Sequence, residues 1–152
     1  MTQLQVGDPA PDFSGLNENG ETISLRDFKG KKLILFFYPQ DNTPTCTTEV
    51  CNLRDHYAAL KSKGFELLGV SPDSQKKHTN FKKKYNLPFP LLADTAHEII
   101  KKYGVWGPKQ LFGVHYEGLL RTTFVINEAA EIQQIITKVT AKNHAQQLLE
   151  GI

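Results

Sequence analysis

Two uninterrupted apolar runs stand out in the hydrophobic pattern of the chain. Residues 32–38 (KLILFFY) and 65–71 (FELLGVS) are apolar without regular alternation, which is typical of strands buried on both faces of a sheet. Between them, Thr43 is a good N-cap and Pro44 is favoured at the first helical position, so we expect a helix to begin here. Apolar residues then recur at helical spacing, and we expect the helix to end at Gly64. These inward-facing residues are Val50, Leu53, Tyr57 and Leu60.

The rest of the chain continues to alternate between strands and helices. An Asn-Gly pair within residues 12–25 predicts two short strands joined by a tight turn. The other predicted elements are helices at 72–85 and 95–103, a strand at 89–92, paired strands at 122–127 and 131–138, and a last helix with Ala145, Leu148, Leu149 and Ile152. The turn at 128–130 lacks the usual glycine. This order predicts an α/β fold with a mixed central β-sheet flanked by helices and an N-terminal β-hairpin.

Composition narrows the class of protein. With 152 residues, 39% of them apolar, we expect residues 1–152 to form one domain. The net charge of +2 gives no electrostatic reason to expect nucleic acid or a membrane as a partner, and we assign the lysine-rich residues 75–84 to the solvated face of a helix. No targeting signal is visible and the longest apolar run is too short to span a bilayer, so we expect a cytoplasmic protein.

The only two cysteines, Cys46 and Cys51, follow the first apolar run. Two thiols in a reducing compartment are more often reactive than structural, although an inert core role stays open, above all for Cys51. They are too few to hold zinc, so we expect no metal and no cofactor. The histidines are scattered, and we expect them to be surface or half-buried residues; they are His56, His78, His97, His115 and His144.

The predicted helix start gives Cys46 a chemical advantage. With Pro44 at the first helical position, Cys46 lies in the first turn, where free N–H groups and the helix dipole stabilise a thiolate. Shifting the pKa of a cysteine from about 8.5 to about 6 requires roughly 3.4 kcal/mol. A helix terminus typically contributes about 0.3–1 kcal/mol and at most about 2. The helix alone is therefore too weak, and the site needs a cation from elsewhere in the chain.

The spacing of the two cysteines predicts a conformational change. Five residues apart on an ideal helix, their Cα atoms are separated by about 8.7 Å. A disulfide requires Cα atoms within about 6.8 Å. If the two thiols join, the first helical turns must unwind.

These motifs resemble the peroxiredoxin family. Pro39-x-x-x-Thr43-x-x-Cys46, with Cys51 five residues later, is similar to the active-site motif of the bacterioferritin comigratory protein, or peroxiredoxin Q, branch. The resemblance extends over nearly the whole chain. Further matching segments are 6–13, 69–73, 91–94, 103–105 and 118–126, the last of which matches the strand that carries the family's active-site arginine.

The resemblance implies a thioredoxin-like fold and thiol-dependent reduction of hydrogen peroxide and organic hydroperoxides. It makes Cys46 the peroxidatic nucleophile and Cys51 the resolving thiol, which forms an intramolecular disulfide that thioredoxin or a similar dithiol reduces. Thr43 would orient the peroxide, Pro39 would shield the thiolate from water, and Arg121 would be the missing cation. Glu49 matches an acidic position that positions Arg121 or a water. For this branch we expect a monomer.

Some features leave alternatives open. Many relatives have Lys in place of Gln40 and Gly in place of Thr45, which puts substrate preference and rate in doubt. A general disulfide oxidoreductase and a redox sensor are the competing functions; the former typically uses Cys-x-x-Cys, unlike this chain. Trp106 and Phe112 could border the active site or dock a partner, and we interpret them as ordinary packing residues.

Overall fold

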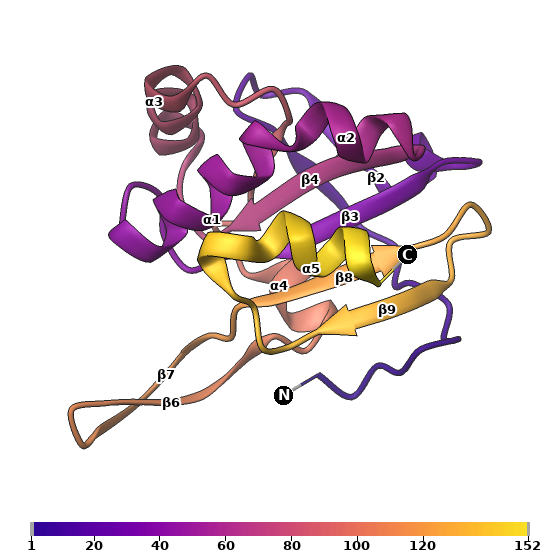
Figure 1. The fold of residues 1–152 in the computed structure, drawn as a ribbon. Helices are drawn as coiled ribbons and strands as arrows, with labels where there is room; N and C mark the ends of the chain where they lie inside the picture. The colour runs from indigo at the N-terminus through magenta and orange to yellow at the C-terminus, as the bar shows by residue number, and fades with distance from the viewer. Residues whose placement is uncertain (1, 152) are drawn as a thin grey trace.

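The computed structural model describes residues 2–151. Its centre is a five-stranded sheet in the order β5-β4-β3-β8-β9 (Figure 1). The strands are β3 (Lys32–Phe37), β4 (Phe65–Ser71), β5 (Leu91–Ala93), β8 (Thr122–Ile126) and β9 (Ile132–Ile136). The first three run parallel, whereas β8 is antiparallel to β3 and β9 is antiparallel to β8. The predicted mixed sheet is thus confirmed.

Helices cover both faces of this sheet. Figure 1 shows α1, α2 and α5 lying over one face, and the core residues of α4 pack against the other. The helices are α1 (Pro44–Asp55), α2 (Tyr57–Ser62), α3 (Gln75–Tyr85), α4 (Glu98–Lys102) and α5 (His144–Glu150), with short 3-10 turns η1 (Leu25–Phe28) and η2 (Ala141–Asn143). The N-terminal hairpin consists of β1 (Ser14–Leu16) and β2 (Thr22–Ser24), as predicted.

The apolar run of β3 lacks polar alternation because β3 is the central strand of the sheet. Ile34 and Phe36 enter the core beneath α1 and α5, and Leu33, Leu35 and Phe37 enter the core on the α4 side. All five side chains are fully buried. A central strand must present apolar side chains to both layers, which removes the polar alternation of a half-exposed strand.

Several predicted boundaries were wrong. The helix expected to run from Thr43 to Gly64 breaks at His56, whose backbone (φ −109°, ψ 11°) separates α1 from α2. The helix expected from residue 72 begins only at Gln75, because the Ser74 side chain accepts a hydrogen bond from Lys77 N and caps it there. In the β8–β9 turn, Ala130 takes the positive φ (60°) that glycine usually supplies. Ile152, predicted to complete the last helix, lies outside the described residues.

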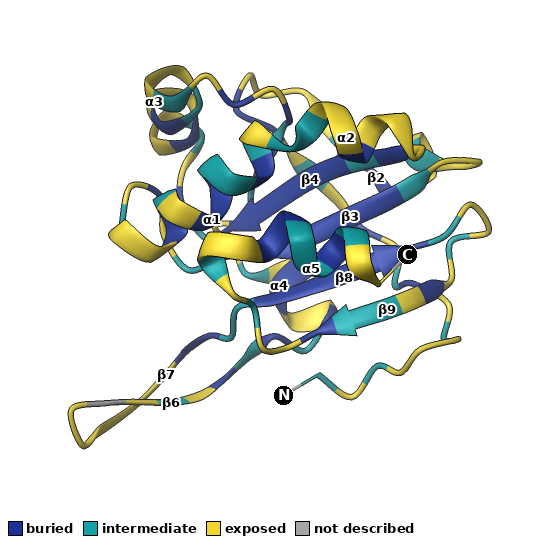
Figure 2. Ribbon diagram, viewed as in Figure 1, coloured by how far each residue is buried: buried dark blue, intermediate teal, exposed yellow. Residues whose placement is uncertain are grey.

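A second hairpin, which the hydrophobic pattern did not predict, extends away from the body of the protein. It consists of β6 (Trp106–Leu111) and β7 (Val114–Leu119), and much of it is exposed in Figure 2. Phe112 at its turn is 96% exposed, so its interpretation as a packing residue is wrong. Trp106, at the base, packs against His97 with the ring centroids 4.7 Å apart and the ring planes tilted by 36°. No helix within residues 2–151 is long and apolar enough to cross a membrane.

Candidate active site

The site begins where β3 ends and α1 starts. Thr43 has the extended backbone of an N-cap (φ −86°, ψ 155°), and Pro44 occupies the first turn of α1 as predicted. The first helical bond runs from Thr47 N to Thr43 O over 2.8 Å. The Thr43 hydroxyl makes no side-chain cap and donates instead to Gln40 O at 3.1 Å. The threonine therefore caps the helix through its backbone only, and its hydroxyl oxygen keeps acceptor capacity.

The two cysteines have different environments on α1. Cys46 is 1% exposed and shares the buried face of the helix with Glu49, Val50 and Leu53, which follow at intervals of three, four and seven residues. Cys51 is half-buried, and burial raises the pKa of its thiol, against a lowering by Arg54. Both thiols are free, and the helix that carries them is continuous.

Arg121 contacts the Cys46 sulfur from a distant part of the chain. It lies in the link between β7 and β8, and the β3–β8 register pairs Phe37 with Thr122. The residue before Thr122 therefore lies at the end of β3, beside the start of α1. Nη2 of Arg121 is 3.1 Å from Cys46 Sγ, and its Nη1 donates to Glu49 Oε1. The cation that the free-energy estimate required is present.

The charges of this cluster are strongly coupled. Burial lowers the pKa of Arg121, but the Glu49 carboxylate and the Cys46 sulfur raise it by more, so the guanidinium stays charged. Burial raises the pKa of Glu49 to about 7, although Arg121 opposes this shift. Glu49 has no exposed surface, which is why the loss of solvation outweighs a direct ion pair.

A second cation lies near the same centre. Lys109 on β6 donates from Nζ to Leu119 O at 2.9 Å. Burial and the Arg121 charge lower its pKa, and the Cys46 sulfur raises it. A cavity of about 370 Å³ opens between these two cations. It is lined by Thr2, Lys109, Leu120, Arg121, Thr122, Thr137, Lys138 and Val139. Sequence reasoning missed Lys109 because the hairpin that carries it was not predicted.

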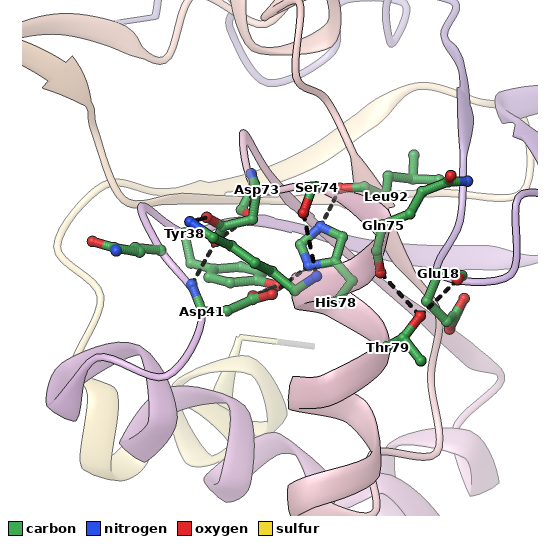
Figure 3. A network of polar contacts seen from close by, with 12 residues as sticks. Glu18, Tyr38, Asp41, Asp73, Ser74, Gln75, His78, Thr79 and Leu92 are labelled. Atoms are coloured by element: carbon green, nitrogen blue, oxygen red, sulfur yellow. Dashed lines mark hydrogen bonds and ion pairs between the residues drawn. The ribbon is translucent and has the colours of Figure 1, made fainter.

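A buried polar network holds the loop between β3 and α1 (Figure 3). Asp41 accepts from the Tyr38 hydroxyl at 2.7 Å, and its second oxygen lies 2.6 Å from His78 Nδ1. His78 Nε2 lies 2.9 Å from Leu92 O, and Asp41 N donates to Asp73 at 2.6 Å. Because every partner belongs to the sheet, its loops or α3, the network fixes the backbone that leads to Thr43.

Two histidines correct the expectation of surface or half-buried roles. His78 and His144 are both 0% exposed. His144, the first residue of α5, has its Nε2 2.8 Å from Thr123 Oγ1 and 3.8 Å from Glu49 Oε2. Asn52 holds α5 in place, since its amide accepts from Ala145 N and donates to Lys142 O, both at 2.8 Å. Nothing in the spacing of the sequence indicated that His144 would meet Glu49.

The other predicted residues lie around this cluster. Pro39 is partly exposed in the loop before α1, and the unusual residues Gln40 and Thr45 are both exposed, so their side chains are not buried against Cys46. Among residues 2–151, no group of three or more His, Cys, Asp or Glu side chains has an arrangement that could hold a metal ion. The assembled centre is thus a buried thiol held by a guanidinium at a helix start, which suits nucleophilic thiol chemistry.

Comparisons with known proteins agree with this geometry. Residues 6–135 match the model of the AhpC/TSA family. Peroxiredoxin Bcp of Bacillus subtilis is 42% identical over 98% of this chain and 95% of its own. The structure of Xanthomonas campestris peroxiredoxin Q has a TM-score of 0.87 at 31% identity, covering 98% of this chain and 94% of its own. A structure of the Xanthomonas campestris bacterioferritin comigratory protein, studied for alkyl peroxide reduction, gives 0.87 at 30% identity, with 99% and 96% covered. The chain therefore belongs to the AhpC/TSA family, in its Bcp and peroxiredoxin Q branch, and is a peroxidase of the oxidoreductase class with a thioredoxin-like fold.

Proposed function

We propose that Cys46 is the nucleophile that reduces hydrogen peroxide and organic hydroperoxides. The observation that carries this proposal is the contact between Arg121 Nη2 and Cys46 Sγ at 3.1 Å. The thiolate attacks the terminal peroxide oxygen, so that the S–O bond forms as the O–O bond breaks. The sulfur is oxidised to a sulfenic acid, and the departing alkoxide or hydroxide takes a proton to become an alcohol or water. Arg121 stabilises both the thiolate and the charge that develops on the departing oxygen.

Thr43 and Pro39 complete the site in this proposal. The Thr43 hydroxyl donates to Gln40 O, which leaves its oxygen free to accept a hydrogen bond from a peroxide O–H. Pro39 has no N–H and limits water access to the sulfur. Glu49 holds Arg121 through its second terminal nitrogen, because its Oε1 accepts from Nη1 while Nη2 contacts Cys46. The buried network around Asp41 keeps the Thr43 loop in place during the reaction.

Cys51 is the resolving thiol in this proposal. It attacks the sulfenic sulfur of Cys46, which forms the disulfide and releases water. Because both residues lie on one continuous helix, α1 must unwind before they can meet. A thioredoxin-type dithiol then reduces the disulfide by exchange. Since the disulfide is internal, residues 1–152 can act as one domain and a monomer, in the cytoplasm where such reductants keep thiols reduced.

The test is a stopped-flow measurement of thiol loss after the reduced protein is mixed with hydrogen peroxide or an alkyl hydroperoxide. We expect a second-order rate far above that of free cysteine. A rate no faster than that of free cysteine would contradict the peroxidase assignment of this site. Thioredoxin, thioredoxin reductase and NADPH added in excess test the reductant, since continuous NADPH consumption requires turnover.

Cysteine variants separate the two thiol roles. Cys46→Ser should abolish the fast reaction. Cys51→Ser should keep the first oxidation step and accumulate sulfenic acid, which dimedone traps with a defined mass increase. If Cys51→Ser also loses the first step, Cys51 has a role other than resolution. Because Cys51 is half-buried and leaves the Arg121 contact untouched, this variant is a matched control for Cys46→Ser.

A further inference from the structure

The Glu49 carboxyl group, which pairs with Arg121, has one oxygen without a hydrogen-bond partner. Oε1 accepts from Arg121, whereas Oε2 is buried and has no partner. A buried carboxylate oxygen left unpaired is costly, so such a group usually takes up a proton or has a charged neighbour. The nearest ionisable group on that side is His144, whose Nε2 is 3.8 Å away.

The hydrogen bonds around His144 fix where its protons can be. Gln147 Oε1 accepts from Thr140 N at 2.9 Å, and Gln147 Nε2 donates to Lys138 O at 3.0 Å, which sets the orientation of this amide. His144 Nδ1, 2.9 Å from Gln147 Oε1, must therefore carry a hydrogen. In the neutral ring, Nε2 then has a lone pair, which accepts from Thr123 Oγ1 at 2.8 Å.

Because Thr123 takes that lone pair, and because 3.8 Å is too long for a hydrogen bond, Glu49 Oε2 and His144 Nε2 are neighbours that interact through charge and not through a direct hydrogen bond. We propose that Glu49 and His144 together hold one proton, either on Glu49 Oε2 or on His144 Nε2, where it would donate to Thr123 Oγ1, and that His144 is thereby a positioning residue that controls how much of the Arg121 charge acts on Cys46. This inference rests on the proposed function of Cys46 and Arg121 and extends it to α5.

The charge balance of the buried cluster supports the shared proton. Three groups that can carry a charge meet there: the Cys46 sulfur and Glu49 from α1, and Arg121 from the link before β8. His144 from α5 faces Glu49, and the charge of Lys109 from β6 interacts with both Arg121 and the Cys46 sulfur. With a thiolate and an ionised Glu49, the single contacting guanidinium leaves a net negative charge in the interior. One proton on the Glu49–His144 pair neutralises it.

The directions in which the pKa values of Glu49 and His144 shift agree with one proton on the pair. Burial raises the pKa of Glu49 to about 7 and lowers the pKa of His144, while Arg121 lowers both. The carboxyl group is therefore the main holder of the proton near neutral pH. While the pair keeps this proton, the Arg121 charge is not neutralised by Glu49 and acts fully on the Cys46 sulfur. Loss of the proton at higher pH turns Arg121 towards a neutral ion pair with Glu49.

The direct test is an NMR titration of the reduced full-length protein labelled with ¹³C-glutamate and ¹⁵N-histidine. The Glu49 Cδ signal is assigned by its absence from Glu49→Gln. We expect Glu49 to titrate near pH 7 and the His144 Nε2 signal to move with the same midpoint, since the two groups share one proton. A Glu49 midpoint in the ordinary carboxyl range near about 4.3, or a His144 signal that does not move at the Glu49 midpoint, overturns the proposal.

The conservative variant His144→Gln tests the direction in which His144 shifts the titration midpoint of Glu49. In His144→Gln the new amide can donate an N–H to Glu49 Oε2, which favours the ionised carboxylate. The Glu49 midpoint should fall by about one to two pH units, a ten- to hundredfold change in ionisation constant. The rate of peroxide reduction should show a bell-shaped pH profile, and His144→Gln should move only its alkaline limb to lower pH. A merely structural defect would lower the rate at every pH.

His56→Gln is the matched control. His56 also lies at the contact between α1 and α5, with its Nε2 3.3 Å from Gln146 Nε2, but its two ring nitrogens face Gln146 and Asn52 O. Neither the Glu49 midpoint nor the pH profile should change in this variant. An equal shift in both variants overturns the assignment to His144. If the wild-type protein does not react with peroxide, the proposed function fails, and the titration of Glu49 and His144 still decides the present inference.

Discussion

Joining Cys46 to Cys51 is expected to unwind the first two turns of α1. In the reduced protein the helix is continuous from Pro44 to Asp55, and an ideal helix separates the two Cα atoms by about 8.7 Å. A disulfide needs them within about 6.8 Å. Two turns correspond to about seven residues, so more than half of the 12 residues of α1 change conformation.

Unwinding of α1 and closure of the disulfide have opposite effects on stability, and their balance determines which assay can detect the unwinding. Unwinding exposes the buried side chain of Val50, which costs about 1.5–3 kcal/mol. The disulfide closes a loop of about six residues, and its restriction of the unfolded chain contributes about 2 kcal/mol of stability. Because these amounts nearly cancel, the melting temperature of the oxidised protein should differ little from that of the reduced protein. Secondary structure and amide exchange are the informative measurements.

Far-UV circular dichroism and hydrogen exchange should therefore be compared between the dithiol and disulfide forms. We expect helical signal to fall on oxidation, with protection lost from Thr47 N, which bonds Thr43 O in the reduced helix. Amides of α2, such as Leu60 N bonded to His56 O, should stay protected and serve as an internal control. Oxidant-treated Cys51→Ser should keep its helical signal. A complete intramolecular disulfide with unchanged dichroism and exchange would refute the spacing argument.

Three further variants test the site and the fold. Arg121→Leu should slow peroxide reduction about 10- to 100-fold, because a hydrogen bond to a charged group contributes about 1.5–3 kcal/mol; stopped-flow rates check this, and an unchanged rate contradicts it. The pKa of Glu49 is about 7 in the folded protein and about 4.3 in the unfolded chain, so its protonation stabilises the fold below about pH 4 and this contribution is lost as the pH rises through about 7. Urea titrations at several pH values should show this loss of about 4 kcal/mol in the wild type and its absence in Glu49→Gln. Gly69→Ala should lower stability by about 1–3 kcal/mol without changing the reaction of Cys46, since its Cβ would lie 2.8 Å from side-chain atoms of Phe36 and Leu91; an undiminished urea midpoint would mean that these side chains move aside freely.

The elements that the sequence predicted well are those that a single local pattern determines. The strand at 65–71 matches β4, and the helix start at Thr43-Pro44 matches α1, because a buried strand and a helix start each carry a compact signal. The break at His56 was missed because apolar spacing continues across it through Tyr57 and Leu60. The spacing of apolar residues indicates only which side of a helix faces the core. Two short helices in succession can keep the same spacing as one long helix.

The β6–β7 hairpin had no usable hydrophobic pattern. Most of its side chains are exposed, and Gly107 and Pro108 within β6 are residues that usually weaken a strand prediction. Its turn uses Phe112 and Gly113, both with positive φ (51° and 78°), and phenylalanine is an unusual residue for that conformation. The position of Lys109 beside the site therefore could not be predicted from the local sequence.

The site itself was only partly predictable. Helix energetics required a cation near Cys46, but only the family motif indicated Arg121, since its position depends on the β3–β8 pairing. Glu49 lies one helical turn after Cys46, so its shared face was readable from spacing. The contact between His144 and Glu49 could not be predicted, because His144 belongs to the last helix. No local pattern connects residues 95 positions apart.

The distance along the chain between Cys46 and Arg121 also determines when reactivity appears during synthesis. The two contacting residues are 75 positions apart, and they meet only after β8 has paired with β3. A nascent or unfolded chain consequently contains an ordinary thiol with no guanidinium beside it. If Cys46 is the nucleophile as proposed, it becomes reactive towards peroxide only when folding is complete, and a chain still being synthesised carries no activated thiol.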